Sequence, residues 1–223
     1  MASRAQEDYL KAIYELEETV GIARTNKLAE KLGIRAATVS EMVQRLSKER
    51  PRLVTYKHHQ GVRLAPAGKK RALSIIRRHR LLETFLHNTL GLNWQEVHEE
   101  AEVLEHHLSQ RVTEALDRHL DFPKFDPHGE PIPDKEGKMA IRACRQLTQL
   151  KEGENFVIFR VNPISGEFLG ALAGMGIGIR TSGRLLAKAP LNGPMTISIE
   201  GPHSATEHTI GRDIADHIYV EPG

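Results

Sequence analysis

Six histidine and glutamate side chains between residues 79 and 106 have the types and spacings of metal ligands. They are His79, Glu83, His98, Glu102, Glu105 and His106. On an α-helix, residues three or four positions apart share a face, so the last four of these side chains are expected to point into one space. A set of oxygen and nitrogen ligands without sulfur favours manganese or iron(II), and the carboxylate-rich mixture favours manganese. The sequence therefore predicts a site for a divalent cation.

A solvated acidic helix face is the alternative interpretation of this cluster. Three carboxylates this close together would repel one another in an empty site, and a divalent cation is their natural counter-charge. The additional histidines also favour a metal site over a merely acidic surface.

The preceding part of the chain is strongly basic. From Arg24 to Arg80 there are sixteen Lys or Arg residues against three Glu, a local net charge of +13, while the rest of the chain carries −11. Such a block is typical of a surface that binds a polyanion. A solvated basic face without a partner is the alternative.

Residues 25–48 have the pattern of a helix-turn-helix that follows a first helix over residues 4–20. A short amphipathic helix ends before Gly33, and a second helix is expected from about Ala36 to Lys48 with a polar, basic outer face. Two β-type runs, 53–56 and 62–64, flank a turn with His58 and His59 and predict a wing. The residues expected to meet DNA are Arg35, Ala37, Thr38, Ser40, Glu41, Gln44, Lys48, Lys57 and Arg63.

Helical patterns return after the wing, at residues 66–90, from the capping Asn93 to about His107, and from 109 to 120. Their apolar side chains exceed what a short helical hairpin hides alone, so we expect a second subunit; packing beneath the winged domain is the alternative. A Pro- and Gly-rich linker spans residues 122–138. Short β-rich runs between Gly153 and Val220 then predict a small β-barrel.

The sequence also indicates the cellular compartment in which the protein is expected. Cys144 is the only cysteine, so the chain has no internal disulfide, which fits a reducing compartment. The amino terminus lacks an apolar signal core, and no run approaches the length needed to span a bilayer. We expect a cytoplasmic protein without a membrane partner.

The chain resembles the diphtheria toxin repressor and manganese transport regulator family of metal-dependent winged-helix repressors, from about Glu7 to its end. The motifs that carry the resemblance are 7–10 with 13–16, 78–83 and 97–106. The resemblance implies a mainly α fold with β structure: an N-terminal winged helix-turn-helix DNA-binding domain (1–65), a helical metal-binding and dimerisation domain (66–140), and a C-terminal small SH3-like, FeoA-type β-barrel (141–223).

The resemblance also implies ligands for two metal sites. The activating metal is expected at Asp8, Glu102, Glu105 and His106. A second site is expected at His79, Glu83 and His98. Asp126 and His128 match a Cys-Pro-His-Gly element that adds ligands to the second site in some manganese-responsive members, with Asp here in place of Cys. Glu167 falls where the β-barrel of such proteins lends an acidic or amide ligand.

Departures within the family refine the expected metal. Iron-responsive members carry Met at the position of Asp8 and Cys at the position of Glu102, whereas this chain has carboxylates at both. Mn(II) is therefore expected, with Fe(II) as the second candidate. The two-metal manganese regulators have Glu where this chain has Lys11, which argues against a binuclear site of their type.

The expected function is a manganese-dependent transcriptional repressor. As a metal-loaded homodimer it would bind double-stranded operator DNA and control metal-uptake genes, because a metal that joins Asp8 to the dimerisation helices sets the spacing of the two recognition helices. One alternative is a winged-helix regulator that does not respond to metal. The other is a metalloenzyme, which is disfavoured because no His-Glu-x-x-His, phosphate loop or nucleophile elbow occurs, so the chain is not expected to be an enzyme.

Overall fold

The computed structural model describes residues 3–57, 60–94, 96–162, 164–201 and 204–223. The chain forms two compact units. The first contains Met1–His79, Leu104–Gln110 and Pro133–Lys138, and the second contains Arg80–Val103, Arg111–Ile132 and Met139–Gly223. Helix α4 (Pro66–Asn88) begins in the first unit and ends in the second. No helix among the described residues is both long and apolar enough to cross a membrane.

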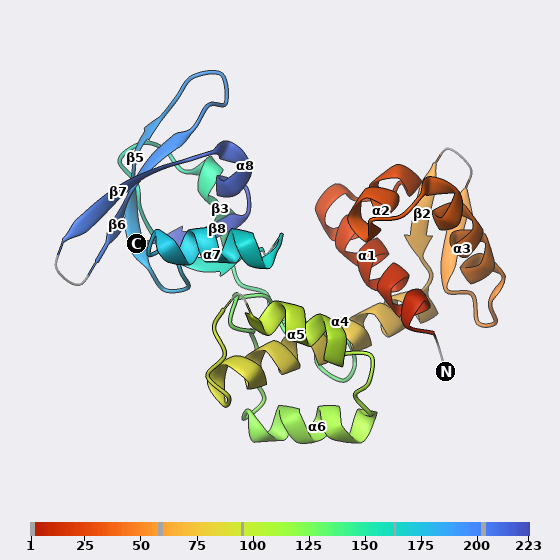
Figure 1. Ribbon diagram of the computed structural model, residues 1–223. Coiled ribbons are helices and arrows are strands. Elements are labelled where there is room, and N and C mark those ends of the chain that lie inside the picture. The colour runs from red at the N-terminus through yellow and green to blue at the C-terminus, as the bar shows by residue number, and fades with distance from the viewer. Residues whose placement is uncertain (1–2, 58–59, 95, 163, 202–203) are drawn as a thin grey trace. The chain divides into compact units, whose positions relative to one another are not determined.

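The first unit contains the predicted helix-turn-helix. Helices α1 (Arg4–Val20), α2 (Thr25–Leu32) and α3 (Ala36–Lys48) precede a hairpin of β1 (Val54–Lys57) and β2 (Gly61–Leu64) (Figure 1). Gly21 and Gly33 end α1 and α2 with left-handed φ angles of 76° and 65°, a conformation that glycine adopts without a steric penalty. The buried side chains Leu28, Val39, Val43 and Leu46 form the core between α2 and α3.

The wing and the outer face of α3 carry the residues expected to meet DNA. The hairpin pairs Val54 with Leu64 and Lys57 with Gly61, while His58 and His59 lie outside the described residues. The expected DNA contacts are all exposed except Ser40, which is half-buried and donates its hydroxyl hydrogen bond to the Ala36 carbonyl at 3.0 Å. These exposed polar groups are compatible with DNA contacts, which stay a prediction.

Two short helices follow α4: α5 (Glu96–Leu104) and α6 (Gln110–His119). Asn93 caps α5 as predicted, because its side chain accepts a hydrogen bond from the Glu96 N–H, and the Glu96 carboxylate accepts one from the Asn93 N–H. Helix α5 ends three residues before the predicted limit, at Leu104. Helical spacing therefore does not determine where the next two side chains, Glu105 and His106, point.

The second unit ends in a six-stranded antiparallel sheet with the order β3-β8-β4-β5-β6-β7. Its strands are β3 (Arg145–Gln146), β4 (Asn155–Val161), β5 (Ser182–Lys188), β6 (Met195–Glu200), β7 (Ala205–Ile210) and β8 (Ile218–Pro222). A 3-10 turn η1 (Leu147–Gln149) and helices α7 (Gly166–Gly174) and α8 (Arg212–Ala215) connect them. The predicted fold class is confirmed. Among the described residues β3 and β7 do not pair, so the SH3-like sheet is open and not a closed barrel.

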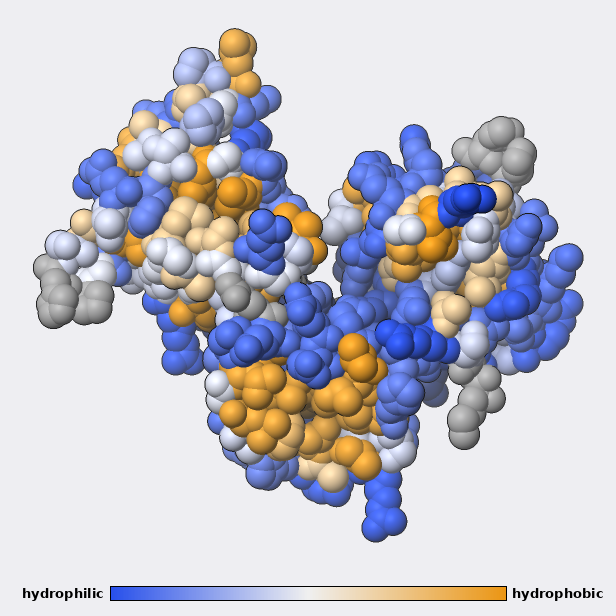
Figure 2. All heavy atoms as spheres, in the orientation of Figure 1, coloured by the Kyte–Doolittle hydropathy of each residue, from blue (hydrophilic) through white to orange (hydrophobic). Residues whose placement is uncertain are grey.

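The helical part of the second unit exposes large apolar side chains. Leu90, Val103, Val112 and Phe122 are each about half exposed. Figure 2 shows apolar side chains gathered over the region of α5 and α6. A contiguous exposed apolar surface of this kind is typical of a protein–protein interface.

Candidate metal centres

The first cluster consists of Asp8, Glu105 and His106, all in the first unit. Asp8 comes from α1, and the other two come from the turn that follows α5. Each residue offers a ligand atom, and these atoms lie within 4.8 Å of one another. His106 Nε2 is 2.9 Å from Asp8 Oδ1 and 3.5 Å from Glu105 Oε1. The cluster thus brings two carboxylates and an imidazole to one point.

Two atoms of the first cluster are buried without a hydrogen bond among the described residues. They are His106 Nε2 and Glu105 Oε1, and Glu105 is fully buried. Their nearest polar neighbours are other ligand atoms of the cluster, with Asp8 Oδ1 2.9 Å from Nε2 and with Nε2 and Oε1 3.5 Å apart. Buried polar atoms that face one another without a hydrogen bond call for an explanation. Imidazole nitrogen and carboxylate oxygen are ligands for divalent manganese and iron, and a cation held between these atoms would satisfy both. The residues present therefore fit a divalent metal ion.

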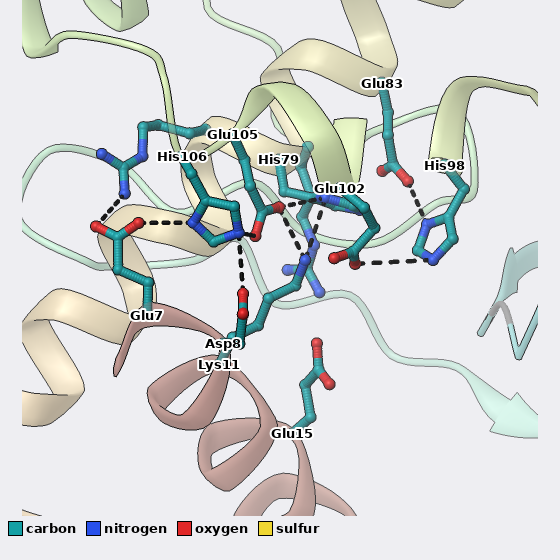
Figure 3. A network of polar contacts seen from close by, with 12 residues as sticks. Glu7, Asp8, Lys11, Glu15, His79, Glu83, His98, Glu102, Glu105 and His106 are labelled. Carbon is teal, nitrogen blue, oxygen red and sulfur yellow. Dashed lines mark hydrogen bonds and ion pairs between the residues drawn. The ribbon is translucent and has the colours of Figure 1, made fainter. Parts of the chain in front are cut away.

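Glu7 orients the imidazole of this cluster and was not among the predicted site residues. Its Oε2 lies 2.7 Å from His106 Nδ1, and its Oε1 accepts a hydrogen bond of 3.0 Å from Arg78. Figure 3 shows Glu7 and Asp8 on opposite nitrogens of the His106 ring. A carboxylate on the remote nitrogen fixes the tautomer and the orientation of a metal-binding histidine. Glu7 thereby leaves Nε2 as the ligand atom; its position next to Asp8 in the sequence gave no signal of this role.

Lys11 and His79 lie on the other side of Glu105. Lys11 Nζ is 2.8 Å from Glu105 Oε2, and His79 Nδ1 is 2.6 Å from the same oxygen (Figure 3). Lys11 Nζ is also 3.2 Å from His79 Nδ1, but an ammonium only donates. We assign the Nδ1 proton to the shorter contact, so Lys11 and His79 both donate to Glu105 Oε2. His79, predicted for the second metal site, thus contacts a residue of the first cluster.

The second cluster consists of Glu83, His98, Asp126 and His128, all in the second unit. Glu83 Oε1 is 2.9 Å from His98 Nδ1, and Glu83 Oε2 is 3.6 Å from His128 Nδ1. Asp126 joins Glu83 and His128 in a buried group whose ligand atoms lie within 4.8 Å of one another. His128 Nδ1 is itself buried without a hydrogen bond in the described chain. This cluster therefore also fits a cation.

Backbone and aromatic contacts hold the second cluster in place. Asp126 Oδ1 accepts hydrogen bonds from the N–H groups of His128 and Glu130, at 2.8 and 2.9 Å. The His128 ring stacks on Trp94 with 5.3 Å between ring centroids, and its Nε2 lies 3.3 Å from the Trp94 carbonyl oxygen. These contacts leave Nδ1 of His128 directed at Glu83.

Burial perturbs the acids and bases of the second cluster. Burial, with the negative charge of Glu83, raises the pKa of Asp126 from 3.8 to about 7, although His128 and Arg80 oppose the shift. Burial lowers the pKa of His128, but the nearby carboxylate of Glu83 and the charge of Asp126 outweigh it, so that this pKa is raised overall. A proton in this cluster thus replaces part of the positive charge that a cation would supply.

The two remaining predicted ligands are Glu102 and Glu167. Glu102 belongs to the second unit, where its Oε1 is 3.9 Å from His98 Nε2 and its side chain is half-buried. Glu167 is exposed in the first turn of α7 and, among the described residues, joins no group with closely spaced ligand atoms. Their roles as ligands stay predictions.

Three family patterns match the chain. The iron dependent repressor N-terminal DNA binding domain matches residues 1–62, the iron dependent repressor metal binding and dimerisation domain matches 65–134, and the FeoA domain matches 145–222. The three matches cover most of the chain and agree with its helix-turn-helix, its central helices and its terminal sheet.

Individual relatives also point to metal-dependent repressors. The HTH-type transcriptional regulator MntR of Geobacillus thermodenitrificans is 37% identical over 152 residues, 68% of this chain and 98% of that protein. The iron-dependent repressor IdeR of Mycobacterium leprae is 38% identical over 150 residues, 66% of this chain and 64% of that protein. A solved manganese-dependent transcriptional repressor in complex with manganese has a TM-score of 0.89 at 36% identity and covers 98% of this chain and 100% of that one. The chain therefore belongs to the iron-dependent repressor family, together with MntR, IdeR and the diphtheria toxin repressor.

Proposed function

We propose that this protein is a manganese-activated transcriptional repressor that binds operator DNA as a homodimer in the cytoplasm and controls metal-uptake genes. Its family consists of metal-dependent transcriptional repressors, so the chain is a regulator and not an enzyme. The observation that carries the proposal is the first cluster, in which Asp8, Glu105 and His106 converge and two buried ligand atoms have no hydrogen bond among the described residues.

The proposed ligands of the activating metal are Asp8, Glu105 and His106, with Glu102 as a predicted fourth. A bound divalent cation would supply the positive charge that the two carboxylates of the cluster need. Asp8 lies on α1, which packs against α2 and β2 of the DNA-binding unit. Glu105 and His106 lie in the segment that continues directly from α5. Residues of the DNA-binding unit and of the chain next to the dimerisation helices thus share one site, which supports a link between metal binding and DNA binding.

The second cluster supports a second, auxiliary metal site. Glu83, His98, Asp126 and His128 are its proposed ligands, and His79 and Glu167 stay candidates from the sequence. All of these ligands offer oxygen or nitrogen and none offers sulfur, which favours manganese, with iron(II) as the alternative. Relatives named for manganese and for iron both occur among the matches. The metal must therefore be identified on the protein itself.

The exposed apolar side chains on the helical part of the second unit support the homodimer. We expect Val112→Glu to convert the dimer to monomer in sedimentation velocity, because a buried unpaired charge opposes association. Leu191→Glu is the matched control, since Leu191 is fully exposed on the sheet domain. A Val112→Glu protein that remains dimeric would place the interface on another surface.

DNA selection under defined metal conditions tests the function. The full-length protein is incubated with a random-sequence duplex pool in chelator, manganese, iron(II) or zinc, and the selected sequence is then titrated by fluorescence anisotropy. We expect selection with manganese and a loss of at least about 100-fold in affinity for Glu105→Gln, because this change removes a ligand charge. Glu100→Gln on the exposed face of α5 is the matched control. Equal binding in chelator would instead indicate a metal-independent winged-helix regulator.

A further inference from the structure

Lys11 is a buried lysine next to the first cluster. Its side chain is 10% exposed, and its ammonium forms an ion pair of 2.8 Å with Glu105, whose side chain is fully buried. Lysine is almost never buried unless it has a charged partner. The family resemblance placed Lys11 where two-metal manganese regulators carry Glu, but the sequence did not predict its ion pair with Glu105.

The carboxylate of Glu105 is divided between two environments. Its Oε2 accepts hydrogen bonds from Lys11 and His79, whereas its Oε1 has no hydrogen bond among the described residues and lies toward His106. One oxygen is therefore already neutralised by the chain itself. Only the other is available to a cation between Asp8 and His106.

We propose that Lys11 acts as a resident cation of the first cluster. It stabilises the metal-free protein by pairing with Glu105, it occupies the side of Glu105 on which a second metal ion would bind, and it weakens the binding of the first ion. This inference rests on the proposed function, because it concerns the same metal site. It differs from a simple structural role in that the lysine affects the metal-free and the metal-bound protein in opposite directions.

The opposite directions follow from charge. Without Lys11, the buried Glu105 carboxylate has no cationic partner on its Oε2 side, and a buried charge that loses its partner is strongly destabilising. In the metal-bound protein, the same ammonium is a positive charge beside a divalent cation and repels it. Removal of the lysine charge should therefore lower stability in chelator and raise the affinity for manganese.

The first experiment compares Lys11→Met and Lys11→Gln with the wild type in the full-length protein. In chelator, we expect the melting temperature of Lys11→Met to fall by about 5–10 °C. Lys11→Gln keeps a hydrogen-bond donor and should fall less, so it serves as the variant that still folds if the Met variant does not. Manganese affinity, measured by competition with a fluorescent chelator, should increase at least about tenfold in both variants.

Lys27→Gln is the matched control for loss of a lysine charge. Lys27 pairs with Glu30 on the exposed surface of α2, and this exposed pair should contribute little. We expect its melting temperature and its manganese affinity to stay at the wild-type values. An equal increase in affinity in this control would attribute the effect to net charge and overturn the proposal.

A second experiment counts ions at the first cluster. His98→Ala is used as the background to remove a proposed ligand of the second cluster, and bound manganese is measured by equilibrium dialysis. Adding Lys11→Glu, which replaces the ammonium with a carboxylate, should allow one further ion per subunit, with an electron paramagnetic resonance spectrum of coupled manganese ions. An unchanged ion count would overturn the claim that Lys11 occupies the position of a second ion.

The outcomes separate this inference from the proposed function. Wild-type protein that binds no manganese would contradict the proposed function, while the melting temperatures in chelator would still test the pairing of Lys11 with Glu105. Wild-type protein that binds manganese, together with Lys11 variants whose affinity is unchanged or weaker, would retain the proposed function. It would overturn the inference that Lys11 opposes the metal.

Discussion

The two clusters balance the negative charge of their buried carboxylates in different ways. The first cluster, in the DNA-binding unit, holds two carboxylates and balances Glu105 with Lys11. The second cluster, in the unit with the sheet, holds two buried carboxylates, and burial with the charge of Glu83 raises the pKa of Asp126 to about 7. One cluster thus uses a fixed cationic side chain where the other uses a proton.

This difference indicates that the two sites have different roles in the response to metal. The first cluster joins α1 to the turn after α5, so a cation there would hold two distant parts of the sequence together. The second cluster is already organised by backbone hydrogen bonds to Asp126 and by the stacking of His128 on Trp94. We therefore expect loss of a ligand in the first cluster to abolish the response to metal and loss of one in the second to weaken it.

The largest expected effect separates the two clusters through their histidines. His106→Ala should reduce manganese-dependent DNA affinity by at least about 100-fold, because it removes a ligand of the activating site. His98→Ala should reduce it by only about tenfold, because it removes a proposed ligand of the auxiliary site and leaves the ligands of the activating site in place. Both are measured by anisotropy at a fixed, saturating manganese concentration. His119→Ala, on α6, is the histidine control, with an expected affinity equal to that of the wild type. Equal losses of DNA affinity in His106→Ala and His98→Ala would contradict the different roles assigned to the two clusters.

Features that depend on interactions between residues close in the sequence were predicted, whereas a feature that depends on contacts between distant residues was not. The ends of α1 and α2 were predicted because Gly21 and Gly33 are local signals for left-handed backbone. The cap of α5 by Asn93 was equally local. The open sheet was not distinguished from a closed barrel, because closure depends on whether β3 and β7 pair across a long stretch of sequence.

The site was predictable in its ligands and not in its supporting groups. Asp8 and His106 were identified through the family resemblance, and the structure brings them within 2.9 Å. The roles of Glu7 and Lys11 depend on how α1 faces residues almost a hundred positions away. Helical spacing does not give that orientation, and it ceases to apply after Leu104, where α5 ends.

A smaller effect tests how precisely the first cluster is built. Glu7→Gln should lower manganese affinity by about tenfold, because an amide no longer provides the charge that fixes the His106 ring and increases its basicity. The measurement is competition with a fluorescent chelator, which reports metal affinity without DNA. Glu7→Asp, which keeps the charge but shortens the side chain, should lose less. Glu18→Gln, exposed near the end of α1, is the control with an unchanged expected affinity. A Glu7→Gln protein with wild-type affinity would show that Asp8 and Glu105 alone orient the imidazole.

The smallest expected effect concerns the proton in the second cluster, measured in chelator. The pKa of Asp126 is raised in the folded protein from 3.8 to about 7, so between these values the folded state holds a proton that the unfolded state has released. The contribution of Asp126 to the free energy of unfolding should therefore be greatest below about pH 4, and it should fall as pH rises to about 7. We expect a melting temperature about 5 °C lower at pH 7.5 than at pH 5 from this source.

Asp126→Asn isolates that contribution, because the amide cannot release a proton yet keeps an oxygen for the N–H groups of His128 and Glu130. The variant should lose most of the fall in melting temperature between pH 5 and pH 7.5. Asp134→Asn is the matched control, since Asp134 accepts the same kind of backbone pair, from Glu136 and Lys138, in a less buried turn. An unchanged pH profile in Asp126→Asn would mean that Glu83 or His128 holds the proton. Saturating manganese should reduce the wild-type slope, because a cation bound to Asp126 favours the ionised carboxylate that high pH also favours.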